Sequence, residues 1–342
     1  MQLKSAVQWI PHPDGYWILR NPEDITCLQV DNLDKQVILQ LSQQPITNIL
    51  AEYELDLEDV QNLLRDLAQA GMLEGTKPPK SKFNLLSFTI PLFNPDTFLT
   101  QHIDKMRWIW TWEFGFLLCA FIASSVAVWL GSSAEVATSH QQLWIAGQNE
   151  TIFKFVLLTM LVIALHELGH AFTLKHYGGI VKEIGLLFVC LIPGCYTDTT
   201  DQYSLVRRKQ RVLVVAAGVL IQLTIWSIAV WVWLFSQSNP VGHQISYLLM
   251  VAALLTVAIN LNPLNRFDGY YLLVAGTGIN NLRKRSFDFY ANLLRREEIE
   301  EAVETRWVLA AYAPLSIIYT VWALSYLMSL IGNWALLNVP SF

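Results

Sequence analysis

The stretch FVLLTMLVIALHELGHAFTL, residues 155–174, decides how this chain is built. It is apolar enough and long enough to cross a bilayer as a helix, which takes about 20 residues. Three ionisable side chains nevertheless interrupt it, at His166, Glu167 and His170. Such groups are costly inside a membrane unless they are paired or bind a ligand, so they indicate a functional site.

The spacing of these side chains is typical of a metal site. His166 and His170 are four positions apart and therefore lie on one face of a helix, one turn apart. That spacing lets both imidazoles bind one Zn²⁺, and Glu167 is placed to take a proton from a water that the metal activates. In a soluble helix the same pattern is often only a solvated polar face. Within an apolar run, that alternative loses most of its weight.

A catalytic zinc site needs a third protein ligand and an open position. The candidate is Asp268, in the stretch NLNPLNRFDG at residues 260–269. Pro263 breaks the preceding helix and Gly269 permits an unusual backbone turn, so a carboxylate here is able to reach a neighbouring helix. Taken alone, Asp268 is an ordinary membrane-edge residue. We also predict that Asn260 and Gly269 bind substrate or support Asp268, because an amide inside a membrane needs partners.

Several apolar runs predict a polytopic helical membrane protein. The runs of spanning length are residues 108–130, 155–174, 212–235, 245–264 and 307–330. Residues 184–193 are apolar but too short to span, and we expect a re-entrant or interfacial segment there. Counting that segment, the fold would be mainly α, with about five or six membrane segments.

Composition supports a membrane protein and excludes a nucleic-acid partner. Hydrophobic residues make up 53% of the chain and charged residues 15%, against about 25% charged in soluble domains. The net charge of -5 offers no basic field for nucleic acid. The N-terminus lacks the apolar core of a cleavable signal peptide. No CxxC pair occurs, so we expect packing roles for Cys27, Cys119, Cys190 and Cys195.

The basic residues predict the orientation in the bilayer. Loops 131–150 and 236–244 contain no Lys or Arg, whereas loops 175–211 and 283–306 are rich in them, and Lys105 precedes the first span. The positive-inside rule then places the N-terminus and both basic loops in the cytoplasm. We expect an integral protein of a bacterial plasma membrane.

The first part of the chain has the pattern of a small soluble α+β domain. Two short strands are predicted at residues 16–19 and 27–30. Three amphipathic helices are predicted at residues 34–41, 46–53 and 57–70, followed by a wing strand from Met72. This is the layout of a winged helix. The predicted organisation is a cytoplasmic domain at 1–75, a Pro-containing linker at 76–106 and a membrane domain at 107–342.

The paired motifs of the membrane domain resemble those of the site-2 protease family. The residues that carry the resemblance are His166-Glu167-Leu168-Gly169-His170, Ala216-Ala217-Gly218 and Asn260-x-x-Pro263-x-x-x-x-Asp268-Gly269. The resemblance implies His166, His170 and Asp268 as zinc ligands and Glu167 as the base. Tyr270 stands where family members often have a second glycine, which bears on the shape of the substrate cleft.

The N-terminal region separately resembles the PqqD-like domains that recognise leader peptides of ribosomally made, modified peptides. The matching segments are the strand pair and residues 45–49 and 59–73. In that family a peptide adds a strand to the exposed sheet edge. The alternative is a winged helix that only stabilises or regulates the membrane domain.

The function expected from all of this is a zinc-dependent intramembrane endopeptidase. Its substrate would be a peptide or membrane-associated precursor, in the maturation or export of a ribosomally made peptide. The main rival is a non-catalytic peptide-binding, export or immunity membrane protein, which would have no need of Glu167. A metal transporter would carry more ionisable residues on facing helices.

Overall fold

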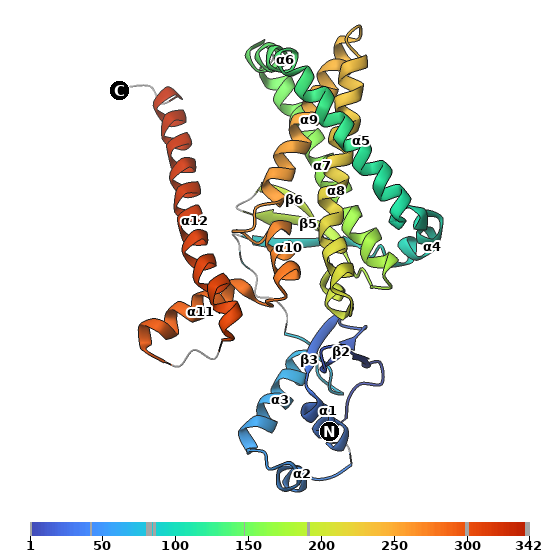
Figure 1. Ribbon diagram of the computed structural model, residues 1–342, viewed down its shortest axis with the longest axis vertical. Helices are drawn as coiled ribbons and strands as arrows, with labels where there is room; N and C mark the ends of the chain where they lie inside the picture. The colour runs from blue at the N-terminus through green and yellow to red at the C-terminus, as the bar shows by residue number, and fades with distance from the viewer. Residues whose placement is uncertain are drawn as a thin grey trace. The chain divides into compact units, whose positions relative to one another are not determined.

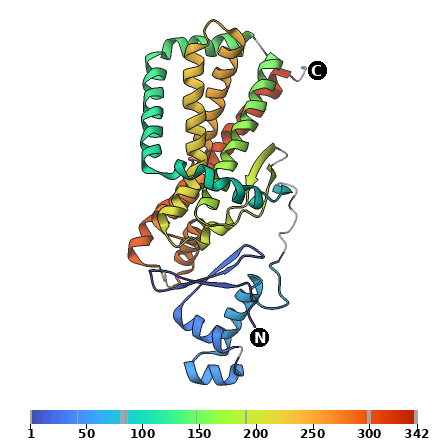
Figure 2. The same cartoon turned by 90° about the vertical axis from the view of Figure 1, so that its right-hand side faces the viewer.

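The computed structural model describes residues 2–41, 43–79, 84, 87–146, 148–189, 192–297 and 301–338 (Figures 1 and 2). The chain divides into two compact units, Met1–Val257 and Ala258–Phe342. Cys190, for which we expected a packing role, lies outside the described residues. The other three cysteines are free thiols.

The first unit begins with an antiparallel sheet of strand order β1-β2-β3. Its strands are β1 (Gln8–Pro11), β2 (Trp17–Asn21) and β3 (Thr26–Val30). The helices that follow are α1 (Asn32–Gln40), α2 (Ile46–Tyr53) and α3 (Leu57–Gln69). Two predicted strands and three predicted helices are therefore present, and β1 is an addition.

One face of this sheet packs on the helices. The buried core consists of Leu19, Val30, Ile38, Leu67, Met72 and Leu73. Gly71 follows α3 with φ +66°, and a Cβ at this position would lie 2.5 Å from Pro78 Cδ, so only glycine fits. Where a wing strand was expected, Leu73 forms an isolated bridge with Leu3.

The predicted linker contains regular structure. Within it lie β4 (Ser87–Phe93) and α4 (Asp96–Met106). β4 pairs antiparallel with β5 (Ile184–Val189), and β5 pairs antiparallel with β6 (Ile192–Thr197). Where a re-entrant segment was expected at 184–193, the described residues thus form parts of two strands, and the central strand β5 is paired on both sides. Pro91 is tolerated because β4 is an edge strand with a register shift after this residue.

Among the described residues, five helices are long and apolar enough to cross a membrane, as the apolar runs predicted. They are α5 (Trp112–Gly131), α7 (Gln148–His176), α8 (Arg208–Phe235), α9 (Pro240–Asn260) and α12 (Val303–Asn338). The short helices η1 (Arg107–Trp110), α6 (Ser133–Ala146) and η2 (Thr200–Ser204) connect elements of the first unit. α7 and α8 pack against each other. The indole N–H of Trp231 donates to Ser125 Oγ over 3.1 Å and ties α8 to α5.

The second unit contains α10 (Asp268–Thr277), α11 (Leu282–Arg295) and α12. Its buried core is formed by Tyr270, Val274, Ile279, Leu282, Leu309 and Tyr312. The Tyr312 hydroxyl donates to the carbonyl of Pro263 over 3.2 Å, and Ser316 Oγ donates to that of Leu264 over 3.1 Å. These bonds anchor the loop before α10 to α12.

Candidate metal centre

Helix α7 brings the two predicted histidine ligands into contact. His166 and His170 are only 3% and 6% exposed, and their Nε2 atoms are 3.0 Å apart. The two rings lie edge to face, with centroids 4.6 Å apart. The predicted spacing of one helical turn is therefore realised, with one nitrogen of each ring aimed at the same point.

A backbone contact sets the tautomer of His170. Its Nδ1 lies 2.8 Å from the carbonyl oxygen of Val214 on α8. A carbonyl only accepts hydrogen bonds, so Nδ1 carries the proton of the neutral ring and Nε2 presents its lone pair. A zinc-binding histidine needs this arrangement, in which the distal ring nitrogen donates to a fixed acceptor. The pair of rings therefore fits a zinc ion.

Two glycines let α7 and α8 approach closely at this level. A Cβ at Gly218 would lie 2.4 Å from His166 Cε1 and 2.6 Å from His166 Nε2. A Cβ at Gly169 would lie 2.8 Å from Ile221 Cδ1 and 3.1 Å from the Ala217 carbonyl oxygen. The His166 ring thus rests against the backbone of α8 at Gly218, and the small-residue motif at 216–218 provides that space.

Strand β6 lies beside the turn of α7 that carries Glu167. Thr197 Oγ1 donates a hydrogen bond to the Glu167 carbonyl over 3.1 Å. Burial raises the pKa of the Cys195 thiol, and the negative charge of Glu167 raises it further, so this carboxylate is close to β6. The sequence alone did not indicate that Thr197 and Cys195 lie near Glu167. The available signal was a second run of strand length, residues 192–197, directly after the apolar residues 184–189.

The remaining predicted site residues belong to the second unit. Asn260 ends α9, and Asp268 is the first residue of α10, so the chain breaks around Pro263 as predicted. A Cβ at Gly269 would lie 2.3 Å from the Leu261 carbonyl oxygen. Gly269 therefore allows a close approach of the backbone before α10, and its φ is not positive.

Comparison with known proteins identifies the segment that contains this site. Residues 154–266 match the family model described as peptidase family M50. The match contains both histidines, Glu167 and Gly218, and it ends just before Asp268. No curated protein matches the chain. No solved structure matches it either. Peptidase family M50 is the site-2 protease family of membrane metalloproteases, and the match supports a membrane protease built on α7 and α8.

Proposed function

We propose that this protein is a zinc-dependent intramembrane endopeptidase. The observation that carries the proposal is the buried pair of His166 and His170 on an apolar helix, with their Nε2 atoms 3.0 Å apart and Glu167 between them in sequence. Two such rings in contact within an apolar helix are costly unless they share a ligand. The match to peptidase family M50 over residues 154–266 supports the same reaction class.

The residues that would hold the zinc are His166, His170 and Asp268. Two observations support Asp268 as a ligand. Its carboxylate stands at the start of α10, and the hydroxyl groups of Tyr312 and Ser316 anchor the loop that precedes this helix. Three protein ligands leave one position open, which is the pattern of catalytic zinc sites. When bound, zinc lowers the pKa of a water molecule and polarises a peptide carbonyl.

In this mechanism Glu167 moves the proton. Its carboxylate takes a proton from the attacking water and delivers it to the leaving amine nitrogen. Thr197 fixes the backbone of this residue through the bond to its carbonyl, and Val214 fixes the ring of His170. Cys195 is close by but is unsuited as a nucleophile, because burial and the charge of Glu167 raise its pKa and keep the thiol protonated.

We assign the capture of the substrate to the N-terminal domain. Strand β1 is an edge of the sheet β1-β2-β3, and an edge strand offers unpaired backbone groups to an extended peptide. The substrate would be a peptide or membrane-associated precursor of a ribosomally made peptide, with its leader bound on this PqqD-like domain. The basic loops support a cytoplasmic position for the domain, at a bacterial plasma membrane.

The test of this function is metal-dependent cleavage by the purified full-length chain. We expect about one zinc per chain, the count for a mononuclear site. A chelator should remove the zinc and stop cleavage of a peptide substrate, and added zinc should restore both. Cleavage that persists after the zinc has been removed would exclude a zinc protease. A chain that binds zinc and peptide but cleaves nothing would favour the rival, a non-catalytic peptide-binding, export or immunity protein.

A further inference from the structure

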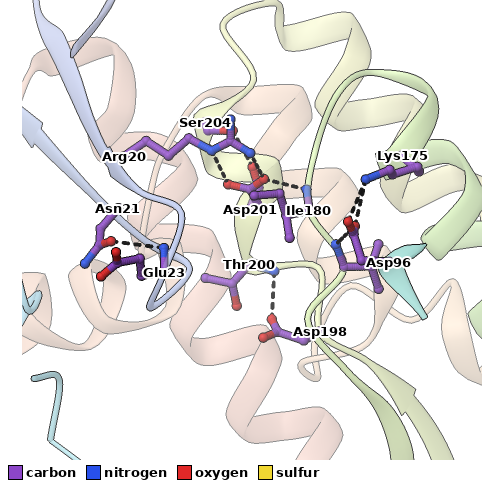
Figure 3. A network of polar contacts seen from close by, with 11 residues as sticks. Arg20, Asn21, Glu23, Asp96, Lys175, Ile180, Asp198, Thr200, Asp201 and Ser204 are labelled. Carbon is purple, nitrogen blue, oxygen red and sulfur yellow. Dashed lines mark hydrogen bonds and ion pairs between the residues drawn. The ribbon is translucent and has the colours of Figure 1, made fainter. Parts of the chain in front are cut away.

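A buried carboxylate outside the metal centre needs an explanation. Asp201 in η2 is 0% exposed, and a charge in that position is strongly unfavourable unless it is paired and hydrogen-bonded. Its Oδ1 accepts from Arg20 Nε over 2.8 Å, and its Oδ2 accepts from Arg20 Nη2 (Figure 3). The backbone N–H of Ile180 also donates to Oδ2, over 2.6 Å. The carboxylate is thus satisfied by a guanidinium that is 181 residues away in the chain.

Arg20 belongs to the N-terminal domain. It lies on β2 opposite Cys27 of β3, and both side chains point away from the face that packs Leu19 onto the helices. Burial raises the pKa of the Cys27 thiol to about 12, with the Asp201 charge as the second cause. The face of the sheet that carries Arg20 is therefore covered by η2.

Tyr16 of the N-terminal domain interacts with Arg211. Burial raises the pKa of the Tyr16 hydroxyl, and the nearby Arg211 guanidinium partly offsets that rise. Tyr16 immediately precedes β2, and Arg211 is in the first turn of α8. The N-terminal domain thus interacts with η2 and with the start of α8.

The residues of η2 also contact the end of α7, the helix that carries the two histidines. Ile180 lies in the turn after α7, so its bond to Asp201 fixes that turn. On the other side, Asp96 of α4 accepts two bonds of 2.8 Å from Lys175 Nζ and one of 3.0 Å from the Val181 N–H. The carboxylates of Asp96 and Asp201 therefore both hold the end of α7 in place. Of these two, only Asp201 pairs with a cation from the N-terminal domain (Figure 3).

Asp201 also lies close along the chain to the strand beside the base. It follows the end of β6 at Thr197, whose hydroxyl bonds to the Glu167 carbonyl. If Arg20 moves away, the buried Asp201 carboxylate keeps one hydrogen-bond donor, the Ile180 N–H. The carboxylate then gains hydration only by moving toward solvent. That movement would pull η2 and β6 away from the Glu167 turn.

We propose that the Arg20–Asp201 ion pair is a latch that docks the N-terminal domain against η2 and the end of α7, and that Asp201 is a positioning residue for the metal centre. A docked domain keeps β6 against α7 and the protease competent, whereas a released domain lowers activity. The positioning half of the proposal rests on the proposed protease function. The docking half does not.

The test uses the full-length chain and two separate readouts. Docking is measured as the rate at which a maleimide alkylates Cys27, in a variant whose other cysteines are replaced by serine. Activity is measured as cleavage of a short peptide that lacks any leader, in the chain with its native cysteines. The variant is Arg20→Met, which keeps the length of the side chain and removes the charge. The matched control is Arg65→Met, which changes an exposed arginine on α3 of the same domain.

We expect Arg20→Met to accelerate alkylation of Cys27 at least tenfold, since the thiol leaves a site where its pKa is about 12. Cleavage should fall at least tenfold through kcat, with the zinc content unchanged. Adding Asp201→Asn should recover part of the lost cleavage, because asparagine still accepts from Ile180 but leaves no unpaired charge. Arg20→Lys should be intermediate, because lysine keeps the charge and loses the fork geometry.

The outcomes separate the two halves of the proposal. Protection of Cys27 that survives Arg20→Met would overturn the latch, whatever happens to activity. Rapid alkylation with unchanged cleavage would overturn the positioning role of Asp201. A loss that Asp201→Asn does not relieve would show that Arg20→Met simply damages the fold, and would also overturn the proposal. A wild-type chain without any cleavage would refute the proposed protease function, and the alkylation rates would still decide whether the domain docks.

Discussion

Replacing Gly218 by alanine should displace the His166 ring, which rests against the backbone of α8 at this position. The added Cβ would lie 2.4 Å from His166 Cε1 and 2.5 Å from Nδ1, whereas carbon atoms make favourable contact at about 3.5–4.0 Å. The ring must therefore retreat by about 1 Å. A Zn–N bond is about 2.0–2.1 Å long, so the displacement is about half of a bond.

The expected effect is on metal affinity more than on folding. Changes to residues that only support a ligand weaken metal binding about 10–100-fold. Displacing the ligand itself should raise the zinc Kd by about 100-fold or more, which corresponds to ~2.7 kcal/mol. Alanine is also a better helix former than glycine by about 1 kcal/mol, which offsets part of the cost of overpacking.

The assay is zinc competition against a chromogenic chelator, with the Tm of the detergent-solubilised protein recorded in parallel. The matched control is Gly115→Ala on α5, where a Cβ would meet nothing within 4 Å. That control gains the same helix propensity without a clash and should bind zinc as the wild type does. A zinc Kd of Gly218→Ala within about threefold of wild type would refute the role we assign to this glycine.

Further substitutions examine other parts of the site. Asp268→Ala should deplete zinc, whereas Asp288→Ala at an exposed position of α11 should not; full zinc content in Asp268→Ala would remove this residue from the ligand set. Thr197→Val keeps the shape of the side chain but loses the bond to the Glu167 carbonyl, and a hydrogen bond of about 1 kcal/mol predicts a roughly fivefold lower kcat. An unchanged kcat would show that β6 does not hold this turn. Deletion of residues 1–75 combined with Asp201→Asn should raise KM for the leader-bearing peptide, in addition to a partial loss of kcat that the short peptide shares. Equal losses for both substrates would indicate that the domain supports folding and does not recruit substrate.

Local patterns in the sequence were sufficient to predict the helices and the histidine pair. The spanning runs, such as the one that became α8, are continuous and apolar, and a helix satisfies its own backbone within one segment. The spacing of His166 and His170 needs only the helical period, and the structure shows their nitrogens facing one point. The small-residue motif at 216–218 was recognised as part of the family resemblance, but nothing local shows that the His166 ring packs on Gly218.

Features that join distant parts of the chain escaped prediction. β4 pairs with β5 across roughly a hundred residues of sequence, and the prolines around it have the composition of a linker. The Arg20–Asp201 pair joins residues 181 positions apart, and each residue taken alone has the pattern of an ordinary surface charge. Sheet register and ion pairing depend on the tertiary arrangement, which neither hydropathy nor periodicity encodes.

Replacing Glu167 is the most direct way to distinguish an enzyme from a binding protein. The measurement is zinc content and peptide cleavage determined on the same preparation of Glu167→Gln, beside wild type and the exposed control Glu113→Gln at the start of α5. We predict about one zinc per chain in all three proteins. Cleavage should fall about 100- to 10,000-fold in Glu167→Gln alone, as expected when a general base is removed. Wild-type turnover by Glu167→Gln with zinc bound would contradict the mechanism proposed for this protein.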